Sequence, residues 1–439
     1  MRAVILAGGK GTRIKSLYPG LPKPMIPILG KPLLQYQIES LTRQGITDIC
    51  LILGYRADVI QTHFGDGEAF GAKIEYIAED EPLGTGGALS LLPREDTLIL
   101  FGDVYFEVDF NRFICFHREK RAEISLFTHP NSHPYDSDIV AADEENRMTA
   151  WKSKKDKNRG ELRNLVNAGL YVFSGDALPT GRAIRRDLDH DLILPALPTG
   201  TVCAYRSTEY VKDMGTPERL AAAEKDIRSG AAAARSLENN QRAVFLDRDG
   251  TINELRGLID SPEQIELIPG AAEAITMLNA SPFLAICVTN QPVVARGMTT
   301  LSELDAIHAR LDTLLGCEGA YLDDLLYCPH HPDKGYPEEA PEYKIECDCR
   351  KPKPGLLIEA AKRYNIDLSR SYMIGDSTAD IAAGKTAGCA TIGVRTGEKT
   401  ADRKYPAESD RVCDDLISAV KTIITKNQNK LPCSKTTGY

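Results

Sequence analysis

Aspartates at the ends of short apolar runs are the residues of this chain best suited to do chemistry. Asp247 and Asp249 follow the run 243–246, and Asp376 follows the run 371–374. Carboxylates can attack phosphorus, transfer protons and bind Mg²⁺. Two aspartates two residues apart can also form an ordinary turn, so this pair needs partners before it indicates a site.

Two other segments of the C-terminal half supply such partners. Thr289 and Asn290 offer a hydroxyl and an amide to phosphate oxygens. Arg350 and Lys351 offer positive charge, with Lys353 as an alternative to Lys351. Together these segments supply a nucleophile, phosphate ligands, cations and a metal-binding acid.

The N-terminal half begins with a different kind of loop. The apolar run 3–6 leads into a glycine-rich turn whose bare backbone N–H groups let a polyphosphate approach closely, and whose arginine adds charge. The turn is no dinucleotide fingerprint, because Ile14 stands where the third glycine should be. Alone, a glycine-rich turn is more often only a turn. Its residues are Gly8, Gly9, Lys10, Gly11, Thr12 and Arg13.

Further groups in this half strengthen the prediction of a phosphate site. Lys23 lies between two prolines, which would hold it rigidly, and Asp103 follows the apolar run 97–101. With Asp213, two carboxylates can bracket one Mg²⁺ whose other ligands come from a triphosphate. A second bare loop suits contact with a base and a ribose. It consists of Gly84, Thr85, Gly86 and Gly87.

Cysteine and histidine residues cluster in the C-terminal half. Cys328 and His330 form one pair at single-residue spacing, Cys347 and Cys349 form another, and His331 is an alternative to His330. Two such pairs around a 16-residue loop predict a closed, tetrahedral, structural zinc site. The metal would supply order that these loop residues cannot obtain from packing. Free thiols near a loop are the alternative.

Strands must position all of these residues. Runs that are apolar throughout alternate with helical patterns in both halves, which predicts parallel sheets covered on both faces. In such sheets ligands gather beyond the carboxyl ends of the strands, where most of the candidate residues fall. We therefore expect an α/β fold with two doubly wound, mainly parallel-sheet domains, the first of them Rossmann-like.

The chain length of 439 residues predicts two to three domains. A stretch of small and polar residues near 228–242 separates the two halves. We expect domains at 1–230 and 241–425, a linker at 231–240 and a flexible tail at 426–439.

Composition restricts the class of protein. A content of 42% apolar and 26% charged residues is ordinary for a soluble globular chain. The net charge of −9 does not indicate a surface that binds nucleic acid, and no apolar run is long enough to span a membrane. Eleven mostly scattered cysteines fit reduced thiols. We expect a cytoplasmic protein with small-molecule substrates, and the sequence leaves a homo-oligomer open.

The N-terminal motifs resemble those of the sugar-1-phosphate nucleotidyltransferase family, over residues 1–228. The resemblance lies in the glycine-rich turn followed by Pro22-Lys23-Pro24. It implies attack of a sugar 1-phosphate on the α-phosphorus of a nucleoside triphosphate, with release of pyrophosphate. The first loop, its arginine and Lys23 would hold the phosphates, Asp103 and Asp213 would hold Mg²⁺, and the second bare loop would meet the nucleoside.

The same resemblance covers the sugar side, with one departure. Asn167 and Gly169 match the sugar-contacting segment, and Lys154 matches a phosphate-binding lysine. Ser153 replaces an acid that often touches sugar hydroxyls in relatives. This departure concerns the identity of the sugar rather than the reaction.

The ordered motifs of the C-terminal half resemble those of the haloacid dehalogenase-like phosphatases, over residues 241–420. The resemblance implies that Asp247 attacks phosphorus to form an aspartyl-phosphate. Asp249 would protonate the leaving oxygen and then activate water. Mg²⁺ would lie between Asp247, the backbone carbonyl of Asp249 and Asp376.

The remaining roles follow from the same resemblance. Thr289 and Lys351 would stabilise the phosphoryl group, and Arg350 would help to recognise the substrate. Only 37 residues separate Thr251 from Thr289, which excludes a large cap and predicts an open site shaped by loops.

The cysteine cluster followed at once by Arg350 resembles the heptose-bisphosphate phosphatase branch, whose nearest sibling is the histidinol-phosphatase branch. Asn290 and Arg296, further expected substrate-binding residues, fit this branch, although residues 292–294 depart from its usual Ser-Gly-Ile. The departure concerns the fit of the substrate and not the chemistry.

Taken together, the two halves constrain each other. Removing the 7-phosphate of heptose 1,7-bisphosphate leaves heptose 1-phosphate, which the other half would convert with GTP into GDP-D-glycero-α-D-manno-heptose. The choice of GTP is inferred from the pathway that would join the two reactions. The sequence itself does not exclude another nucleoside triphosphate. One alternative is a mannose- or glucose-1-phosphate nucleotidyltransferase fused to a histidinol-phosphatase-like enzyme. Another is a regulatory protein that senses sugar nucleotides.

Overall fold

The computed structural model describes residues 1–9, 17–156, 158–333, 335 and 339–428. It divides into two compact units, each described here over those residues. Unit 1 comprises Met1–His129, Asp136–Lys157 and Leu165–Asn239, and unit 2 comprises Pro130–Tyr135, Asn158–Asn164 and Asn240–Tyr439. Within the described ranges, no helix is long and apolar enough to cross a membrane.

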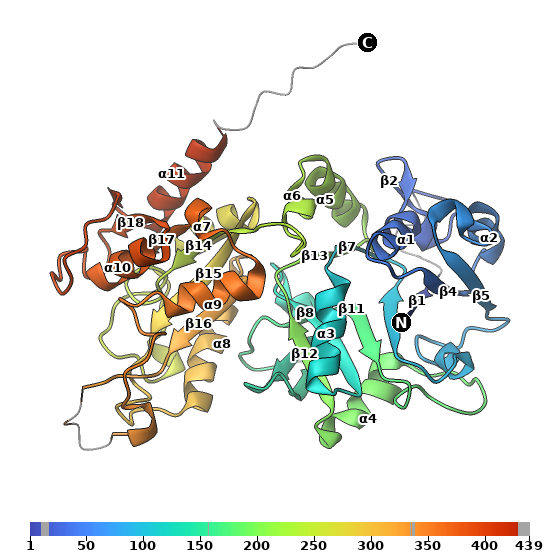
Figure 1. The fold of residues 1–439 in the computed structure, drawn as a ribbon, viewed down its shortest axis with the longest axis horizontal. Coiled ribbons are helices and arrows are strands. Elements are labelled where there is room, and N and C mark those ends of the chain that lie inside the picture. The colour runs from blue at the N-terminus through green and yellow to red at the C-terminus, as the bar shows by residue number, and fades with distance from the viewer. Residues whose placement is uncertain (10–16, 157, 334, 336–338, 429–439) are drawn as a thin grey trace, which may run out of the picture. The chain divides into compact units, whose positions relative to one another are not determined.

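Unit 1 is built on a nine-stranded mixed sheet (Figure 1). Its parallel part has the spatial order β5 (Lys73–Ala78), β4 (Asp48–Leu53), β1 (Arg2–Leu6) and β6 (Thr97–Phe101). The antiparallel strand β11 (Val166–Phe173) pairs with β6 and leads to β9 (Ile139–Ala142) and β10 (Met148–Lys152). It also pairs with β8 (Ile124–His129), which lies beside β12 (Val202–Arg206). Strands β7 (Val104–Glu107) and β13 (Tyr210–Asp213) form a separate ribbon, and β2 (Pro27–Ile28) and β3 (Lys31–Pro32) a small hairpin.

The helices of unit 1 cover both faces of this sheet. On one face, α1 (Leu33–Arg43), α2 (Ala57–Phe64) and α3 (Phe110–Lys120) contribute apolar side chains to a shared core. The other face is covered by the short helices η3 (Gly87–Leu91) and η5 (Leu188–Ile193), followed by α4 (Leu194–Ala196). Covering both faces explains why β1 and β6 are apolar throughout.

The expected linker is partly helical. After α5 (Pro217–Arg228), residues Ala231–Ala234 form α6, as a run of alanines favours. Ala232 and Leu237 are buried in unit 1. The buried Glu209 carboxylate accepts hydrogen bonds from the backbone N–H of Leu237 (2.9 Å) and of Asp109 (2.7 Å). This part of the chain therefore packs as structure of unit 1.

Unit 2 contains a six-stranded sheet that is parallel throughout, as expected. Its spatial order is β16 (Asp324–Cys328), β15 (Phe283–Asn290), β14 (Arg242–Leu246), β17 (Tyr372–Gly375), β18 (Ala390–Val394) and β19 (Arg411–Cys413). β14, the first of these six strands in chain order, lies in the middle of the sheet, and the order reverses between β14 and β17. Such a reversal leaves a crevice beyond the carboxyl ends of the strands, where ligands bind in sheets of this kind.

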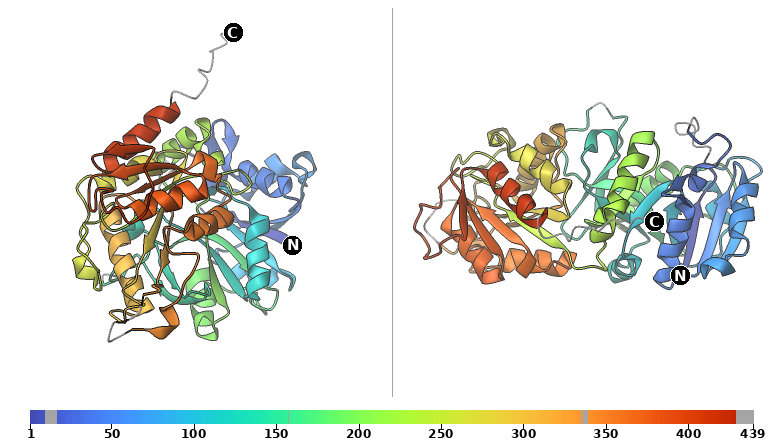
Figure 2. Two further views of the ribbon diagram at one scale, coloured as in Figure 1. Left: turned by 60° about the vertical axis from the view of Figure 1, so that its left-hand side comes forward. Right: turned by 90° about the horizontal axis from the view of Figure 1, so that it is seen from above.

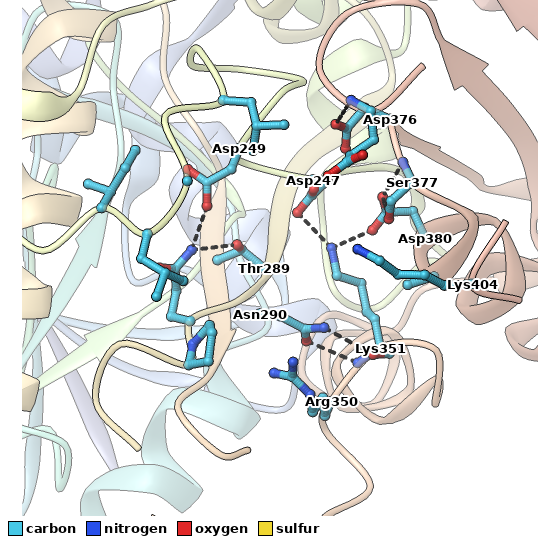
Figure 3. A pocket seen from close by; sticks show the side chains of 18 residues that line it. Asp247, Asp249, Thr289, Asn290, Arg350, Lys351, Asp376, Ser377, Asp380 and Lys404 are labelled. Atoms are coloured by element: carbon cyan, nitrogen blue, oxygen red, sulfur yellow. Dashed lines mark hydrogen bonds and ion pairs between the residues drawn. The ribbon is translucent and has the colours of Figure 1, made fainter. Parts of the chain in front are cut away.

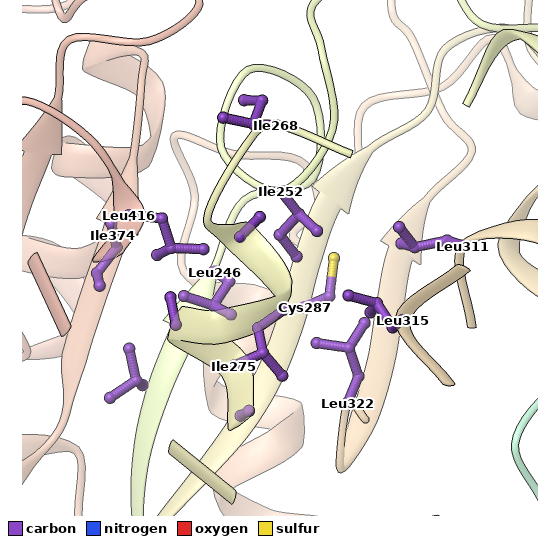
Figure 4. Close-up of a cluster of buried hydrophobic side chains, with 14 of the residues drawn as sticks. Leu246, Ile252, Ile268, Ile275, Cys287, Leu311, Leu315, Leu322, Ile374 and Leu416 are labelled. Carbon is purple, nitrogen blue, oxygen red and sulfur yellow. The ribbon is translucent and has the colours of Figure 1, made fainter. Parts of the chain in front are cut away.

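Helices lie on both sides of this sheet (Figure 2). Helices α7 (Ala271–Asn279), α8 (Leu301–Cys317) and α11 (Leu416–Gln428) share one core, in which Leu246, Ile275, Leu315 and Leu416 are buried (Figure 4). Burying each such side chain contributes about 1.5–3 kcal/mol. Helices α9 (Gly355–Tyr364) and α10 (Thr378–Ala387) complete the alternation.

The expectation that spacing excludes a large cap is confirmed in unit 2. Between Thr251 and Thr289 the chain forms only the 3-10 helix η7 (Pro262–Gln264), α7 and β15 with their connections, which leaves no room for a cap domain. Of the expected tail, residues 426–428 belong to α11, and 429–439 lie outside the described residues.

Candidate active sites

The crevice of unit 2 brings most of the predicted phosphatase residues together. Asp247 and Asp249 follow β14, Thr289 and Asn290 end β15, and Asp376 follows β17. A cavity of about 220 Å³ opens at this edge of the sheet (Figure 3). The predicted residues that line it are Asp247, Asp249, Thr289, Asn290, Arg350, Lys351 and Asp376.

Three buried carboxylates converge at the base of this cavity. One oxygen each of Asp247, Asp376 and Asp380 lies within 4.8 Å of the others. The Lys351 Nζ lies 2.6 Å from Asp247 Oδ1 and 2.6 Å from Asp380 Oδ1. Burial and the charge of Asp380 raise the pKa of Asp247 to about 7, while burial and the charge of Asp247 raise that of Asp376 to about 8. Since one lysine cannot balance three carboxylates, the group suits a divalent cation.

Asp249 lies apart from this group and is held by three side chains. The fully buried Arg248 donates to both carboxylate oxygens of Asp249 at 3.0 Å. Gln291 donates to Asp249 Oδ2 at 2.8 Å and to Thr289 Oγ1 at 2.9 Å, and Asn253 donates to Asp249 Oδ1 at 2.9 Å. The predicted acid–base residue is therefore fixed in orientation by its neighbours.

Two glycines enclose the carboxylate of Asp376. Gly250 and Gly397 both have positive φ, and a Cβ at either would lie about 2 Å from Asp376 Oδ2. The same oxygen accepts the backbone N–H of Glu398 at 2.7 Å. Glycine is required here because no side chain fits between the loop backbones and this carboxylate.

The structure distinguishes among the expected cations. Asn290 exchanges two hydrogen bonds of 3.0 Å with the Lys351 backbone, which places the lysine at the cavity base. Burial alone would lower the pKa of Lys351, but Asp247 and Asp380 raise it above its ordinary value. Lys353 instead pairs with the exposed Asp348 at 3.4 Å.

The two expected arginines differ as well. Arg350 lines the cavity and donates to the His330 carbonyl at 3.1 Å. Arg296 is not among the residues that line this cavity, and it lies close enough to His331 to help lower the pKa of that imidazole, after burial and Arg350.

The cysteine cluster closes into a compact group in the second unit. The sulfur atoms of Cys328 and Cys347 are 3.5 Å apart, and those of Cys347 and Cys349 are 3.2 Å apart. His330 Nδ1 lies 3.4 Å from Cys349 Sγ and 3.8 Å from Cys328 Sγ. Tetrahedral Zn²⁺ with bonds of about 2.0–2.3 Å separates its ligand atoms by roughly 3.5–3.8 Å, so the four residues fit this ion. His331 is not part of this group, and its Nδ1 accepts the Asp333 N–H at 3.1 Å.

In unit 1, Lys23 joins the two acids predicted to hold a metal. Its Nζ lies 2.5 Å from Asp103 Oδ2 and 3.1 Å from Asp213 Oδ1. Asp103 follows β6, and Asp213 ends β13, whose pairing with β7 brings the two together. Arg219 donates to Asp213 Oδ2 at 2.5 Å and lies 3.4 Å from Asp136. A charged cluster suited to phosphates and a metal thus lies where the strand order reverses, between β1 and β6.

The predicted phosphate loop is only partly described. Gly8 and Gly9 directly follow β1, and Gly8 packs against the backbone of Gly54. Gly11, Thr12 and Arg13 lie outside the described residues.

The second bare loop owes its glycines to packing within the unit. A Cβ on Gly84 would lie 2.2 Å from the Arg186 carbonyl, and one on Gly87 would lie 2.3 Å from that of Ile184. Thr85 Oγ1 accepts the Leu188 N–H at 2.8 Å, which holds the loop against the start of η5. Gly86 donates its backbone N–H to the Arg186 carbonyl.

The residues expected on the sugar side lie around Asp138. Its side chain accepts the Lys154 N–H at 2.8 Å, and its carbonyl accepts the Asn167 N–H at 3.1 Å. Asn167 Nδ2 donates to the Tyr171 hydroxyl, which donates to Asp189 Oδ1 at 3.2 Å. Burial and the charge of Asp187 raise the pKa of Asp189 to about 6. Gly169 packs against the ring of Phe101.

Several residues of these sites were not found from the sequence. Arg248 stands between the two aspartates, but nothing in its spacing indicates that it bonds Asp249. Arg219 and Asp189 belong to the helices α5 and η5 and Asp138 to a loop, and the approach of these elements to the site depends on the tertiary fold. Lys404 lies in a loop with no periodic pattern.

Comparison with known proteins gives a separate match for each half of the chain. The nucleotidyl transferase family matches residues 2–230, and the HAD-hydrolase-like family matches residues 348–419. The chain is 35% identical over 258 residues to the mannose-1-phosphate guanylyltransferase of Mycobacterium tuberculosis, covering 56% of this chain and 70% of that protein.

The C-terminal half has relatives of a different kind. Over 189 residues the chain is 40% identical to the D-glycero-beta-D-manno-heptose-1,7-bisphosphate 7-phosphatase of Pasteurella multocida, covering 42% of this chain and 100% of that protein.

Among solved structures, HddC from Yersinia pseudotuberculosis matches with a TM-score of 0.45 and 29% identity, over 52% of this chain and 99% of that one.

Proposed function

Because this chain belongs to the nucleotidyl transferase family in its N-terminal half and to the heptose-1,7-bisphosphate 7-phosphatase family in its C-terminal half, we propose that it catalyses two steps of nucleotide-activated heptose synthesis. The C-terminal half removes the 7-phosphate of heptose 1,7-bisphosphate. The N-terminal half transfers GMP from GTP to the resulting heptose 1-phosphate and releases pyrophosphate. We assign the transferase to residues 1–230 and the phosphatase to residues 241–425.

The phosphatase reaction centres on Asp247, and the pairing of its carboxylate with Lys351 is the observation that carries the proposal. An oxygen of Asp247 attacks the phosphorus of the 7-phosphate, and Asp249 protonates the departing 7-oxygen. Asp249 then takes a proton from water, which attacks the aspartyl-phosphate and releases phosphate. Thr289 and Lys351 bind the phosphoryl oxygens throughout.

Mg²⁺ is the metal that we propose for this centre. Asp247, Asp376 and the backbone carbonyl of Asp249 would hold it, with Asp380 beside them. When bound, it supplies charge that offsets the repulsion between the nucleophilic carboxylate and the phosphate.

In the transferase, an oxygen of heptose 1-phosphate displaces pyrophosphate from the α-phosphorus of the triphosphate. Lys23, with Arg13 and the glycine-rich turn, binds the phosphates, and Asp103 and Asp213 would hold a second Mg²⁺. Lys154 and Asn167 lie on the sugar side. The second bare loop meets the nucleoside.

The choice of sugar and base depends on combining the halves. The phosphatase relatives act, by name, on a β-configured heptose bisphosphate, whereas the guanylyl route that we propose takes the α-1-phosphate. The guanylyltransferase relative carries mannose 1-phosphate in its name, so this sugar is the second candidate acceptor.

We also propose that Cys328, His330, Cys347 and Cys349 bind a structural Zn²⁺. The ligand distances support a closed tetrahedral site, and four protein ligands leave no open position for catalysis. A cytoplasmic location agrees with reduced cysteines and with these soluble substrates.

One reaction analysed by mass spectrometry tests the proposal. The enzyme receives the α- or β-anomer of heptose 1,7-bisphosphate, Mg²⁺ and an equimolar mixture of GTP, ATP, UTP and CTP. GDP-heptose as the main product is the expected result. Equal use of all four triphosphates would contradict the guanine assignment, and no release of phosphate from either anomer would contradict the heptose assignment. Mannose 1-phosphate, supplied in a parallel reaction, tests the second acceptor.

A further inference from the structure

The cavity of unit 2 is lined by one cation, Lys404, that has no role in the proposed reaction at Asp247 or in the substrate recognition expected of Arg350. Five acidic residues line this cavity, and three basic ones do. The acids are Asp247, Asp249, Asp376, Asp380 and Glu398, and the basic residues are Arg350, Lys351 and Lys404. A substrate with two phosphates therefore enters a site with an excess of negative charge, and needs cations that are not already committed.

Two of the three cations have partners inside the protein. Lys351 is buried and contacts Asp247 and Asp380, and Arg350 donates to the His330 carbonyl. Lys404 is exposed, and no hydrogen bond or ion pair joins its amino group to the described residues. Figure 3 shows its side chain directed toward the other residues that line the cavity.

The loop that carries Lys404 is fixed on both sides of this residue. Thr378 at the start of α10 donates its backbone N–H and its hydroxyl to Asp402, each at 2.9 Å. The Tyr405 N–H donates to the Thr378 hydroxyl at 3.1 Å. Earlier in the loop, Glu398 bonds Asp376. Lys404 is thus presented by a loop tied to Asp376, a proposed Mg²⁺ ligand, and to the start of α10.

From this arrangement we infer that Lys404 binds the second phosphate of a sugar bisphosphate, the one that is not cleaved. The inference builds on the phosphatase function proposed above. The cleaved phosphate must reach Asp247 at the buried base, where Lys351 meets it. The sugar then extends outward, so its other phosphate lies at the exposed end of the cavity, beside Lys404, the lining cation that makes no ion pair with the described residues. Lys404 is thereby a specificity-determining residue that favours bisphosphates over monophosphates.

The test compares two substrates that differ only in that phosphate. We would measure kcat/KM for heptose 1,7-bisphosphate and for heptose 7-phosphate with the unaltered enzyme and with Lys404→Met, Lys404→Arg and Lys399→Met. Lys399 is the matched control, since it is exposed, lies on the same loop and does not line the cavity. Lys404→Met should lower kcat/KM for the bisphosphate about tenfold and leave the monophosphate within about twofold. Lys404→Arg should restore most of the preference, and Lys399→Met should change neither substrate.

Other results would overturn the inference. Equal losses on both substrates would place Lys404 on the cleaved phosphate, and an unchanged ratio would mean that it contacts neither. Fructose 1,6-bisphosphate and fructose 6-phosphate form a second pair that separates this inference from the proposed function. If the enzyme hydrolyses only the fructose pair, the heptose assignment fails while the ratio still tests Lys404. Hydrolysis of neither pair would overturn both.

Discussion

Asp247 combines two properties that its sequence position alone does not give. It directly follows the central strand β14 of unit 2, and it is buried beside Asp376, Asp380 and Lys351. Burial raises its pKa, so the carboxylate depends on Lys351 and on the proposed Mg²⁺ to stay ionised and nucleophilic. The residue is thus both the proposed nucleophile and the point where the charges of the site meet.

Replacing this nucleophile should separate the two activities. In Asp247→Asn the amide cannot form the aspartyl-phosphate, while Lys351 keeps its contact with Asp380. We expect phosphate release to fall by roughly a thousandfold or more, and pyrophosphate release from heptose 1-phosphate and GTP to stay unchanged. Both products can be measured on one preparation. Loss of both activities would show that the sites are not independent.

The opposite separation is expected at Asp103. Asp103→Asn removes one of the two carboxylates proposed to hold Mg²⁺ and one partner of Lys23. Nucleotidyl transfer should fall at least about a hundredfold, with phosphate release unchanged. Asp136→Asn is the control, because Asp136 is exposed and contacts Arg219 without contacting Lys23. A transferase that tolerates Asp103→Asn as well as it tolerates the control would contradict this role.

At the scale of strands and loops, the sequence predicted the site wherever a strand delivers a residue directly. Asp247, Thr289 and Asp376 all follow or end apolar runs, and the parallel sheet gathers them. Contacts made through tertiary packing were not predictable. Arg248 turns into the core to hold Asp249, and Lys404 comes from a loop whose position depends on Thr378.

The fold, too, has features that follow from the sequence pattern and features that depend on tertiary packing. The all-parallel sheet of unit 2 agrees with its unbroken apolar runs. In unit 1, β11 runs antiparallel to both β6 and β8. A run such as Val166–Phe173, buried on both faces, has the same composition in either direction, so its sequence does not reveal the orientation. The helix α6 lies where a linker was expected, because its alanines favour a helix that packing then fixes.

Glu209 predicts a pH dependence for the segment that α6 begins. Burial raises the pKa of Glu209 to about 7, against 4.5 ordinarily, so the folded state binds its proton more tightly than the unfolded chain does. The stability of unit 1 should therefore fall as the pH rises from about 4.5 to about 7, by about 3 kcal/mol from this group. Glu209→Gln should remove that decrease, and urea unfolding at pH 5 and pH 8 measures it.

The partly exposed Glu238 provides the control for this experiment, since Glu238→Gln changes the same charge nearby. If the free energy of unfolding changes between the two pH values as much in Glu209→Gln as in the unaltered protein, the buried carboxylate does not titrate as described.

At the scale of the whole molecule, two separate sheets each carry their own charged site. Each site lies at a reversal of strand order, between β1 and β6 in unit 1 and between β14 and β17 in unit 2. Each unit also has its own hydrophobic core. The chain thus repeats one architectural solution for phosphate chemistry, with different groups at the carboxyl ends of the strands.

Loss of zinc should affect one unit and spare the other. Cys347→Ser removes one of the four proposed ligands, so we expect no zinc by elemental analysis and a loss on the order of 3 kcal/mol or more in the stability of unit 2. When both activities are followed during heating, Cys347→Ser should lose phosphatase activity at a lower temperature than the unaltered protein. It should lose nucleotidyl transfer at the same temperature as the unaltered protein. Cys317→Ser, an exposed cysteine of unit 2 outside the cluster, is the control. A full zinc content in Cys347→Ser would remove this assignment.

The central position of β14 has a consequence for the order in which the protein is made. β14 leaves the ribosome before its neighbours, but β17, which flanks it on one side, and the loop with Lys404 follow only on the order of ten seconds later, at about 5–20 residues per second. Until then the backbone N–H and C=O groups along that edge of β14 have no partner strand. The nascent phosphatase is therefore inactive and exposed to aggregation during most of its own synthesis, and it is at this stage that a chaperone would protect it.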